Sequence, residues 1–595
     1  MENKICQNCK QNFVIEADDF DFYKKIDVLA PTWCPECRMQ RRMVFMNDRT
    51  LYTRDCDLCK KKIISVYPAD SPNKIYCNSC WWSDKWQPES FGREYDFSKP
   101  FFSQFKEFMD AVPWPALDTI EPTMVNSQYC SMCSYLKNCY LLFNSDYSED
   151  CAYSTYLERS KRSFDMCMAD LCELCYEGTN MFKCFKTFFS ANCQDCVEVA
   201  FSKNLKGCSN CFGCVNLRNK QYHIFNIPVS KEDYAETLKN FRIGSYRAVA
   251  DIQKKLNELE MRQPKKYMEG TNNSNVSGHY VFNSKNTFKA YEVGGCENCK
   301  YCHYLFLAST KDSWDFTMWG GGASWMYECM GCGGGQQDIK FSYGCWSNST
   351  IGLEYCMLIK VSCSYLFGCI GLRNKKYCIL NKQYTKEEYE ALVPKIRKHM
   401  SDMPYKDALN RTYGYGEFFP PELSHFAYNE SVAQQFLPLD EEKTKSIGLR
   451  WKNPPEKDYG ITMLSQDLPD DIADVRDDIL QFTIGCEHKG ACNHQCSTAF
   501  RLTPSELEFY RSMNLPLPRI CPNCRHYARL NKKNPIRLYP GRCACAGEKS
   551  GDGAYANAAK HFHGAAPCPN KFETSYAPER EEIIYCDQCY NSEVV

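Results

Sequence analysis

The sequence predicts a mainly β protein with small α/β cysteine modules at both ends and two cysteine-rich β-solenoid blocks between them, each block followed by a helix. Stretches 9–56 and 496–543 align without a gap at a constant offset of 487. A second pair of stretches, starting at Cys208 and Cys363, aligns at an offset of 155. The segments upstream of each are short apolar units bounded by Asn, Ser, Asp and Gly, which is typical of strand–turn–strand coils.

The two ends of the chain are copies of one cysteine framework. In the first part of the match the aligned cysteines are Cys9, Cys34, Cys37 and Cys56 with Cys496, Cys521, Cys524 and Cys543. The match resumes at an offset of 509, with Cys59, Cys77 and Cys80 on Cys568, Cys586 and Cys589. The C-terminal copy therefore contains an insertion of 22 residues, rich in Gly and Ala, which carries His561 and His563. We expect this insertion to be a surface loop.

The cysteine content indicates metal binding rather than a disulfide scaffold. The chain has 41 cysteines in 595 residues, and those near its ends come as CxxC pairs. The first ten residues, MENKICQNCK, contain no apolar signal region. No stretch approaches the roughly 18 consecutive apolar residues of a membrane span. We therefore expect a cytoplasmic protein, without membrane association, whose thiolates bind zinc.

Zinc in structural sites takes four Cys or His ligands in a tetrahedron, and two CxxC pairs supply them. The pairs predict two N-terminal sites: Cys6, Cys9, Cys34 and Cys37, and then Cys56, Cys59, Cys77 and Cys80. In the third site Asn493 stands where Cys6 stands in the first copy. The predicted ligands are Cys492, Cys496, Cys521 and Cys524, with Cys486, His488 or His494 as substitutes. The fourth site has Cys568, Cys586 and Cys589 with either Cys543 or Cys545, and the register favours Cys543. The prediction is about four zinc ions.

Both copies continue from CPxCR into a basic segment that can form a helix, as in treble-clef zinc modules. Arg38, Arg41 and Arg42 would lie on one face of the first helix, and Arg525 and Arg529 on one face of the second. A basic helix fixed by zinc suits contacts with phosphates. The alternative is an ordinary solvated helix face.

Four longer motifs carry a resemblance to a known family. They are CDLCKKKIISVY, IYCNSCWWSDKW, GEFFPPELSHFAYNESVAQQF and NKFETSYAPEREEIIYCDQCY. With them the chain resembles a family of large, cysteine-rich, multi-zinc-ribbon (treble-clef-like) proteins of candidate-phylum bacteria. The resemblance spans nearly the whole chain and implies zinc binding.

The central blocks are expected to be solenoids with cysteines facing inward. Ser230 and Thr385 each precede a helical pattern and are predicted N-caps. A free cysteine behaves as a small buried hydrophobe, so the 23 central cysteines are expected to pack rather than bind metal. At such positions Ala should be a milder replacement than Ser, whose hydroxyl would need a buried partner. The alternative is that clusters such as Cys296, Cys299 and Cys302 hold a further zinc or an iron–sulfur cluster.

These predictions divide the chain into seven parts. They are an N-terminal double zinc module (1–90), a linker (91–125), the first solenoid block (126–228), a helical connector (229–272), the second block (273–382), a helix and extended linker (383–480), and a C-terminal double zinc module (481–595).

The formal net charge of −1 excludes a globally basic nucleic-acid binder, so any such activity must come from local patches. The predicted function is architectural: a zinc protein that binds RNA or a ribonucleoprotein through the arginines of its zinc helices. Two alternatives stay open, a protein–protein scaffold that uses the aromatic solenoid face and a thiol redox or metal-handling protein that uses the central cysteines. No catalytic motif supports an enzyme, and the sequence leaves the oligomeric state open.

Overall fold

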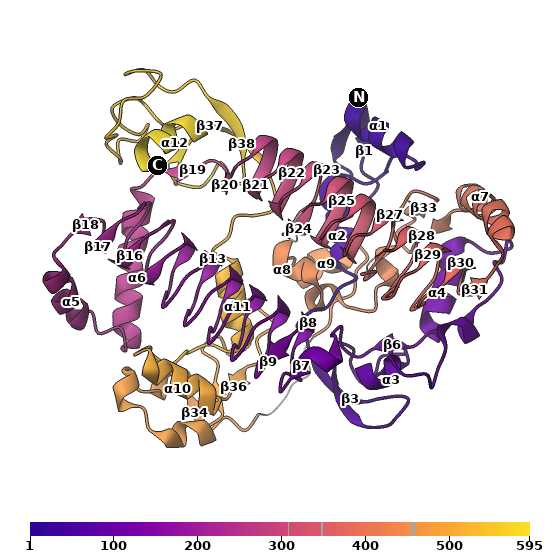
Figure 1. The fold of residues 1–595 in the computed structure, drawn as a ribbon, viewed down its shortest axis with the longest axis horizontal. Coiled ribbons are helices and arrows are strands. Elements are labelled where there is room, and N and C mark those ends of the chain that lie inside the picture. Colours follow the sequence, from indigo (N-terminus) through magenta and orange to yellow (C-terminus); the bar gives the residue numbers. More distant parts are fainter. Residues whose placement is uncertain (307–308, 347–348, 454–458) are drawn as a thin grey trace.

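The computed structural model describes residues 1–595 except 307–308, 347–348 and 454–458. The protein is mixed and strand-rich, with cysteine groups at both ends and in the centre. Two ladders of short parallel strands dominate the molecule (Figure 1). We call them the first ladder, residues 124–228, and the second ladder, residues 270–383. Helix α11 (Pro522–Leu530) lies against the first ladder and helix α2 (Pro35–Met43) against the second.

In the first ladder successive coils pair in parallel at a spacing of 12 residues, and the last two strands pair antiparallel. Phe143 pairs with Thr155, and Thr155 pairs with Cys167. The strands are β7 (Met124–Val125), β8 (Ser131–Ser134), β9 (Leu136–Lys137), β10 (Phe143–Asp146), β11 (Thr155–Glu158), β12 (Cys167–Asp170), β13 (Thr179–Phe182), β14 (Ala191–Gln194), β15 (Val197–Ala200), β16 (Ser209–Phe212), β17 (Gln221–Ile224) and β18 (Ile227–Pro228).

A period of three residues governs each 12-residue coil of the first ladder. Every third residue from 132 to 225 has a positive φ, which makes a corner. Every third residue from 130 to 214 is buried, and all of these are Cys, Ser, Leu, Met, Ala, Gly, Thr or Val. Left-handed backbone costs a non-Gly residue roughly 1–2 kcal/mol, so the stacked coils must offset this cost at many corners. Four corners per coil leave an interior narrow enough to require small side chains.

Serines on the inner face satisfy the backbone of the neighbouring coil. The Leu157 N–H donates to Ser145 Oγ (3.0 Å), and the Ser145 hydroxyl donates to the carbonyl of Phe143 (2.9 Å). Each inner serine can thus act as donor and acceptor at once. Backbone groups at the corners are therefore hydrogen-bonded although they are buried.

Apart from its last strand pair, the second ladder is also parallel, with less regular coils of 11 to 14 residues, as in Ser274 with Lys285 and Glu297 with Lys311. Its strands are β20 (Gly270–Thr271), β21 (Ser274–Phe282), β22 (Lys285–Gly294), β23 (Glu297–Lys300), β24 (His303–Leu305), β25 (Lys311–Trp319), β26 (Ser324–Cys332), β27 (Gln337–Lys340), β28 (Ile351–Glu354), β29 (Ser364–Phe367), β30 (Lys376–Ile379) and β31 (Lys382–Gln383).

A capped helix follows each ladder, as predicted. Ser230 caps α5 (Lys231–Asn240) by accepting the Asp233 N–H (3.0 Å), and Thr385 caps α7 (Lys386–Asp402) by accepting the Glu388 N–H (3.2 Å). Further helices of these connecting regions are α4 (Phe101–Ala111), α6 (Tyr246–Met261), α8 (Val432–Phe436) and α9 (Glu441–Ser446).

The terminal regions repeat one local design, in which a hairpin turn faces the start of a short helix. At the N-terminus the elements are β1 (Glu2–Ile5), β2 (Asn12–Ile15), α1 (Ala17–Lys25) and α2, then β3 (Tyr52–Asp55), β4 (Lys62–Ser65), β5 (Ile75–Tyr76) and α3 (Asn78–Trp81). At the C-terminus they are β35 (Ile484–Gly485), β36 (Ala499–Phe500), α10 (Pro504–Ser512) and α11, then β37 (Tyr539–Arg542), β38 (Lys571–Thr574), β39 (Ile584–Tyr585) and α12 (Asp587–Val594).

Candidate metal centres and the helices that carry them

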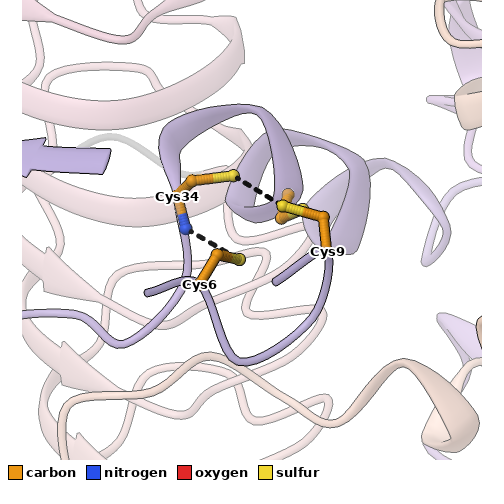
Figure 2. Close-up of side chains that lie close together, drawn as sticks. Cys6, Cys9 and Cys34 are labelled. Carbon is orange, nitrogen blue, oxygen red and sulfur yellow. Dashed lines mark hydrogen bonds between the residues drawn. The ribbon is translucent and has the colours of Figure 1, made fainter. Parts of the chain in front are cut away.

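The first predicted cysteine set comes together in space. Cys6 and Cys9 flank the turn between β1 and β2, and Cys34 is the N-cap residue of α2, with Cys37 in its first turn. The four sulfurs lie within 4.8 Å of one another. Figure 2 shows Cys6, Cys9 and Cys34 turned toward a common point, with Cys9 Sγ 3.7 Å from Cys34 Sγ and the Cys34 N–H donating to Cys6 Sγ (3.2 Å). Such backbone donors stabilise the thiolate form that binds metal.

The second set, formed by Cys56, Cys59, Cys77 and Cys80, repeats this geometry. Cys59 Sγ lies 3.8 Å from Cys77 Sγ, and the Cys77 N–H at the start of α3 donates to Cys56 Sγ (3.2 Å). Burial tends to raise the pKa of Cys56, but the backbone hydrogen bonds outweigh it and lower this pKa to about 7. This thiol is therefore poised to lose its proton near neutral pH.

The third set uses Cys486, which the sequence offered as a substitute, in place of the first choice, Cys492. The group that mirrors the first site is Cys486, Cys496, Cys521 and Cys524, so Cys486 and not Cys492 takes the place of Cys6. The Cys521 N–H donates to Cys486 Sγ (3.2 Å), as the Cys34 N–H does to Cys6. The sequence alignment misplaced this ligand because it held a constant offset through a loop whose length differs between the copies. Cys492 lies beside the group, with its Sγ 3.7 Å from Cys524 Sγ.

The fourth set is Cys543, Cys568, Cys586 and Cys589. The Cys586 N–H donates to Cys543 Sγ (3.2 Å), which reproduces the bond between Cys77 and Cys56. Cys543 is therefore the counterpart of Cys56, as the register predicted. The Sγ of Cys545 instead accepts a hydrogen bond from the Asn557 amide (3.2 Å).

The 22-residue insertion packs its histidines against this site rather than forming only an exposed loop. His563 Nε2 lies 3.3 Å from Cys589 Sγ, and buried His561 Nε2 lies 2.9 Å from Glu593 Oε1. Part of the insertion is nevertheless open: Gly553 and Gly564 have free space where a side chain would stand.

The sulfur spacing in these groups suits a tetrahedral metal ion. A Zn–S bond of about 2.3 Å gives a sulfur–sulfur edge of about 3.8 Å in a regular tetrahedron. The closest sulfur pairs of the first, second and fourth groups are separated by 3.7, 3.8 and 3.9 Å. All 41 cysteines are free of disulfides. The groups are therefore suited to metal binding, and soft thiolate ligands favour zinc among the common ions.

The structure corrects the prediction that the helix arginines face solvent and phosphate. All five residues are buried, none more than 2% exposed, and they are Arg38, Arg41, Arg42, Arg525 and Arg529. The face of each helix that carries them is turned into the protein, against a ladder. Sequence spacing placed these residues on one face correctly, but it could not tell a solvated face from one that meets buried carboxylates.

In the N-terminal half the arginines of α2 bind carboxylates of the second ladder. Arg38 Nη2 lies 2.7 Å from Asp315 Oδ2, and Arg42 Nη1 lies 2.8 Å from Glu328 Oε2 and 3.2 Å from Asp315 Oδ1. Arg41 bridges Glu328 and Glu417, each at 2.6 Å. Three buried cations thus meet three buried carboxylates.

The C-terminal half repeats this network on the first ladder. Arg529 Nη1 lies 2.7 Å from Asp165 Oδ1 and 3.3 Å from Glu177 Oε1. Arg525 Nη1 lies 3.3 Å from Asp165 Oδ2 and 3.2 Å from Glu506 Oε1. Helices α2 and α11 therefore each dock on the ladder that is farther from them in the sequence.

An aromatic contact accompanies each network. Phe22 of α1 stacks on Trp314 with ring centroids 4.0 Å apart, and Phe509 of α10 stacks on Phe164 at 4.4 Å. Phe22 and Phe509 are related by the same offset of 487. The duplication thus covers the docking surface as well as the metal ligands.

The pKa values follow from this burial. For Glu328, desolvation pushes the pKa upward, but Arg41, Arg42 and Arg38 together outweigh it and lower the pKa. Glu177 behaves in the same way beside Lys532, Arg529 and Arg525. Both carboxylates therefore stay ionised where an ordinary buried Glu would take up a proton.

The central cysteines are all buried, in the interiors of the two ladders or beneath the helices that cover them. Burial raises the pKa of Cys130 and of Cys363 to about 12 in each case. Cys130 and Cys363 therefore stay neutral and act as packing residues, whereas hydrogen bonds with Cys184 and Cys193 lower the pKa of Cys196 to about 3. The pattern of short apolar units read from the sequence did not reveal that small residues recur at every third position.

No protein-family model and no curated protein matches this chain. The resemblance to multi-zinc-ribbon proteins of candidate-phylum bacteria therefore stays a prediction. Within the part of the chain that the structure describes, no helix has both the length and the apolar character needed to cross a bilayer.

Proposed function

We propose that this protein is a zinc-dependent architectural scaffold. Four zinc ions would hold zinc-ribbon or treble-clef-like modules at the two ends, and the ladders would be β-solenoid blocks joined through these modules. The observation that carries the proposal is the pair of matching Arg–carboxylate networks. In both, the arginines of the proposed zinc helices form ion pairs with carboxylates of the protein itself. This arrangement favours the scaffold over RNA binding through those arginines.

A surface for a partner is available at one corner of the first ladder. Tyr135 and Tyr147 are 50% and 58% exposed, and their rings stack with centroids 4.6 Å apart. Leu171, two coils beyond Tyr147 in the same register, is 38% exposed. Exposed aromatic residues on a rigid surface are typical anchors of protein interfaces. We propose that this corner binds a protein partner.

Affinity purification from native cells tests the proposal, with nuclease treatment and two variants. In Tyr135→Ser/Tyr147→Ser/Leu171→Ser the partner should be lost. A control variant, Phe562→Ser, changes another exposed ring (57% exposed) and should keep it. A nuclease-resistant partner that only the corner variant loses supports the scaffold. Partners released by nuclease from both variants would favour RNA binding.

A further inference from the structure

The C-terminal copy contains an extra loop inside its first metal site. Cys6 and Cys9 are three positions apart, whereas their counterparts Cys486 and Cys496 are ten positions apart. The hydrogen bonds before the loop are kept: the Cys6 N–H donates to the Gln11 carbonyl (2.9 Å), and the Cys486 N–H donates to the Thr498 carbonyl (2.8 Å). The extra residues therefore lie between Glu487 and Cys496.

This loop carries a second set of metal ligands. His488, Cys492 and His494 all lie in it, and together with Cys524 they form a group whose ligand atoms are within 4.8 Å of one another. A Cys2His2 set of this kind is one of the common zinc ligand combinations. The N-terminal copy has a single residue, Asn8, in place of the loop.

Cys524 belongs to both groups. Its Sγ lies 3.9 Å from Cys486 Sγ in the first group and 3.7 Å from Cys492 Sγ in the second. The counterpart of Cys524 in the N-terminal copy is Cys37, whose Sγ accepts a hydrogen bond from the Asn8 amide (3.3 Å). In the N-terminal copy the Asn8 amide thus occupies one side of the sulfur. In the C-terminal copy three further ligands stand beside the corresponding sulfur, that of Cys524.

The two histidines have buried nitrogens without partners. Nδ1 of His488 and Nδ1 of His494 are shielded from solvent and make no hydrogen bond within the described residues. A buried polar atom without a partner is costly unless something else binds it. The His494 ring is held by stacking on Tyr527, with centroids 5.4 Å apart and planes 5° apart. A metal ion bound through Nδ1 of each ring would satisfy both nitrogens.

Charge also favours a second ion. One divalent ion among four thiolates leaves two excess negative charges in a half-buried site. Adding a second divalent ion together with the Cys492 thiolate and two neutral imidazoles leaves one. The second ion therefore reduces the charge that the protein must accommodate.

We infer that the C-terminal module holds a dinuclear zinc site, in which the Cys524 thiolate bridges one ion bound by Cys486, Cys496 and Cys521 and a second bound by His488, Cys492 and His494. The protein would then carry five zinc ions. The inference rests on the third site of the proposed function, and it adds an ion that the N-terminal copy does not have.

Elemental analysis of the purified full-length protein tests this inference. We expect five zinc ions in the wild type, four in His488→Ala/His494→Ala and four in Cys492→Ser. The control His223→Ala changes a histidine that contacts the Gln221 carbonyl (2.8 Å) and should keep five. Equal zinc content in the wild type and both loop variants would overturn the second ion. Four ions in the wild type and three in the histidine variant would overturn it too. The third site would then hold a single ion whose ligands include His488 or His494.

Cobalt substitution gives a second readout that does not depend on variants. Two Co²⁺ ions that share a thiolate couple magnetically, so the cobalt-loaded wild type should show a weaker spin-resonance signal per ion than His488→Ala/His494→Ala. The same signal per ion in both would contradict a bridge. If Cys521→Ser loses no metal, the third site itself is absent, and the proposed function fails separately from this inference.

Discussion

Arg38 and Arg525 stand 487 positions apart, and each makes the same contact on a different ladder. Arg38 lies 2.7 Å from Asp315, and Arg525 lies 3.3 Å from Asp165. Both aspartates sit at left-handed corners, with φ of +51° and +56°. The repeated modules thus contact aspartates at left-handed corners of both ladders.

Removing one buried arginine should destabilise the protein strongly. Arg42→Met leaves Asp315 and Glu328 with less compensation in the interior, and breaking a buried ion pair costs about 3–5 kcal/mol. Arg247→Met is the matched control, because Arg247 is exposed and its pair with Asp470 is long, 3.8 Å. Thermal unfolding should show a clear loss for Arg42→Met and almost no change for the control. Equal midpoints for the two variants would contradict the docking role.

Acid should weaken the docking of α2 and α11. The folded-state pKa of Glu328 is lowered, so its contribution is present above the usual Glu value of about 4.3 and is lost as the pH falls through the lower folded value. Glu177 contributes with the same sign. Asp315 and Asp165 of the same networks act with the opposite sign, because desolvation raises their pKa. The part of the stability that depends on Glu328 and Glu177 should therefore decline as the pH falls below about 4.3.

Loss of zinc in acid would produce a similar decline, so the comparison needs Glu328→Gln. This variant should be less stable at pH 7 and should lose less further stability on acidification, while its zinc content follows that of the wild type at each pH. Parallel stability curves for the two proteins would assign the acid effect to the thiolates alone.

Replacing a cysteine inside the first ladder should affect stability modestly and release no zinc. The Cys151 sulfur lies 3.2 Å from the carbonyl of Glu149, and the Ser148 and Ser154 hydroxyls donate to the equivalent carbonyls three residues away on either side. A serine at 151 would find its partner in place. Ser should therefore be at least as mild as Ala, opposite to the expectation from sequence. Thermal midpoints of Cys151→Ser and Cys151→Ala, with zinc analysis, check this; loss of a zinc equivalent would show that Cys151 is a ligand.

The sequence predicted the parts of this protein that depend on local spacing. The CxxC pairs, the register of Cys543 and the caps Ser230 and Thr385 all follow from neighbouring residues. It named Cys486 only as a substitute for Cys492, because a loop of different length shifts that residue out of register.

The arginines could not be placed from the sequence for a different reason. Their partners lie more than 200 positions away in the N-terminal half, as with Arg38 and Asp315, and nothing in a single sequence pairs them. The helix pattern fixes a basic face, but only the fold decides whether that face meets solvent or buried carboxylates. The three-residue period was present in the sequence, but mixed Cys, Ser and Leu at the inner positions obscured it.

Hydrogen–deuterium exchange on Arg525→Met/Arg529→Met tests most directly whether the zinc helices hold the protein together. We expect faster exchange in α11 and also in the first ladder around Asp165 and Glu177, more than 300 residues earlier in the chain, with the second ladder and α2 unchanged. Unchanged exchange in the first ladder would contradict the docking role. If the variant also lost RNA affinity and its RNA binding depended less on salt concentration, phosphate binding by these arginines would be the better account.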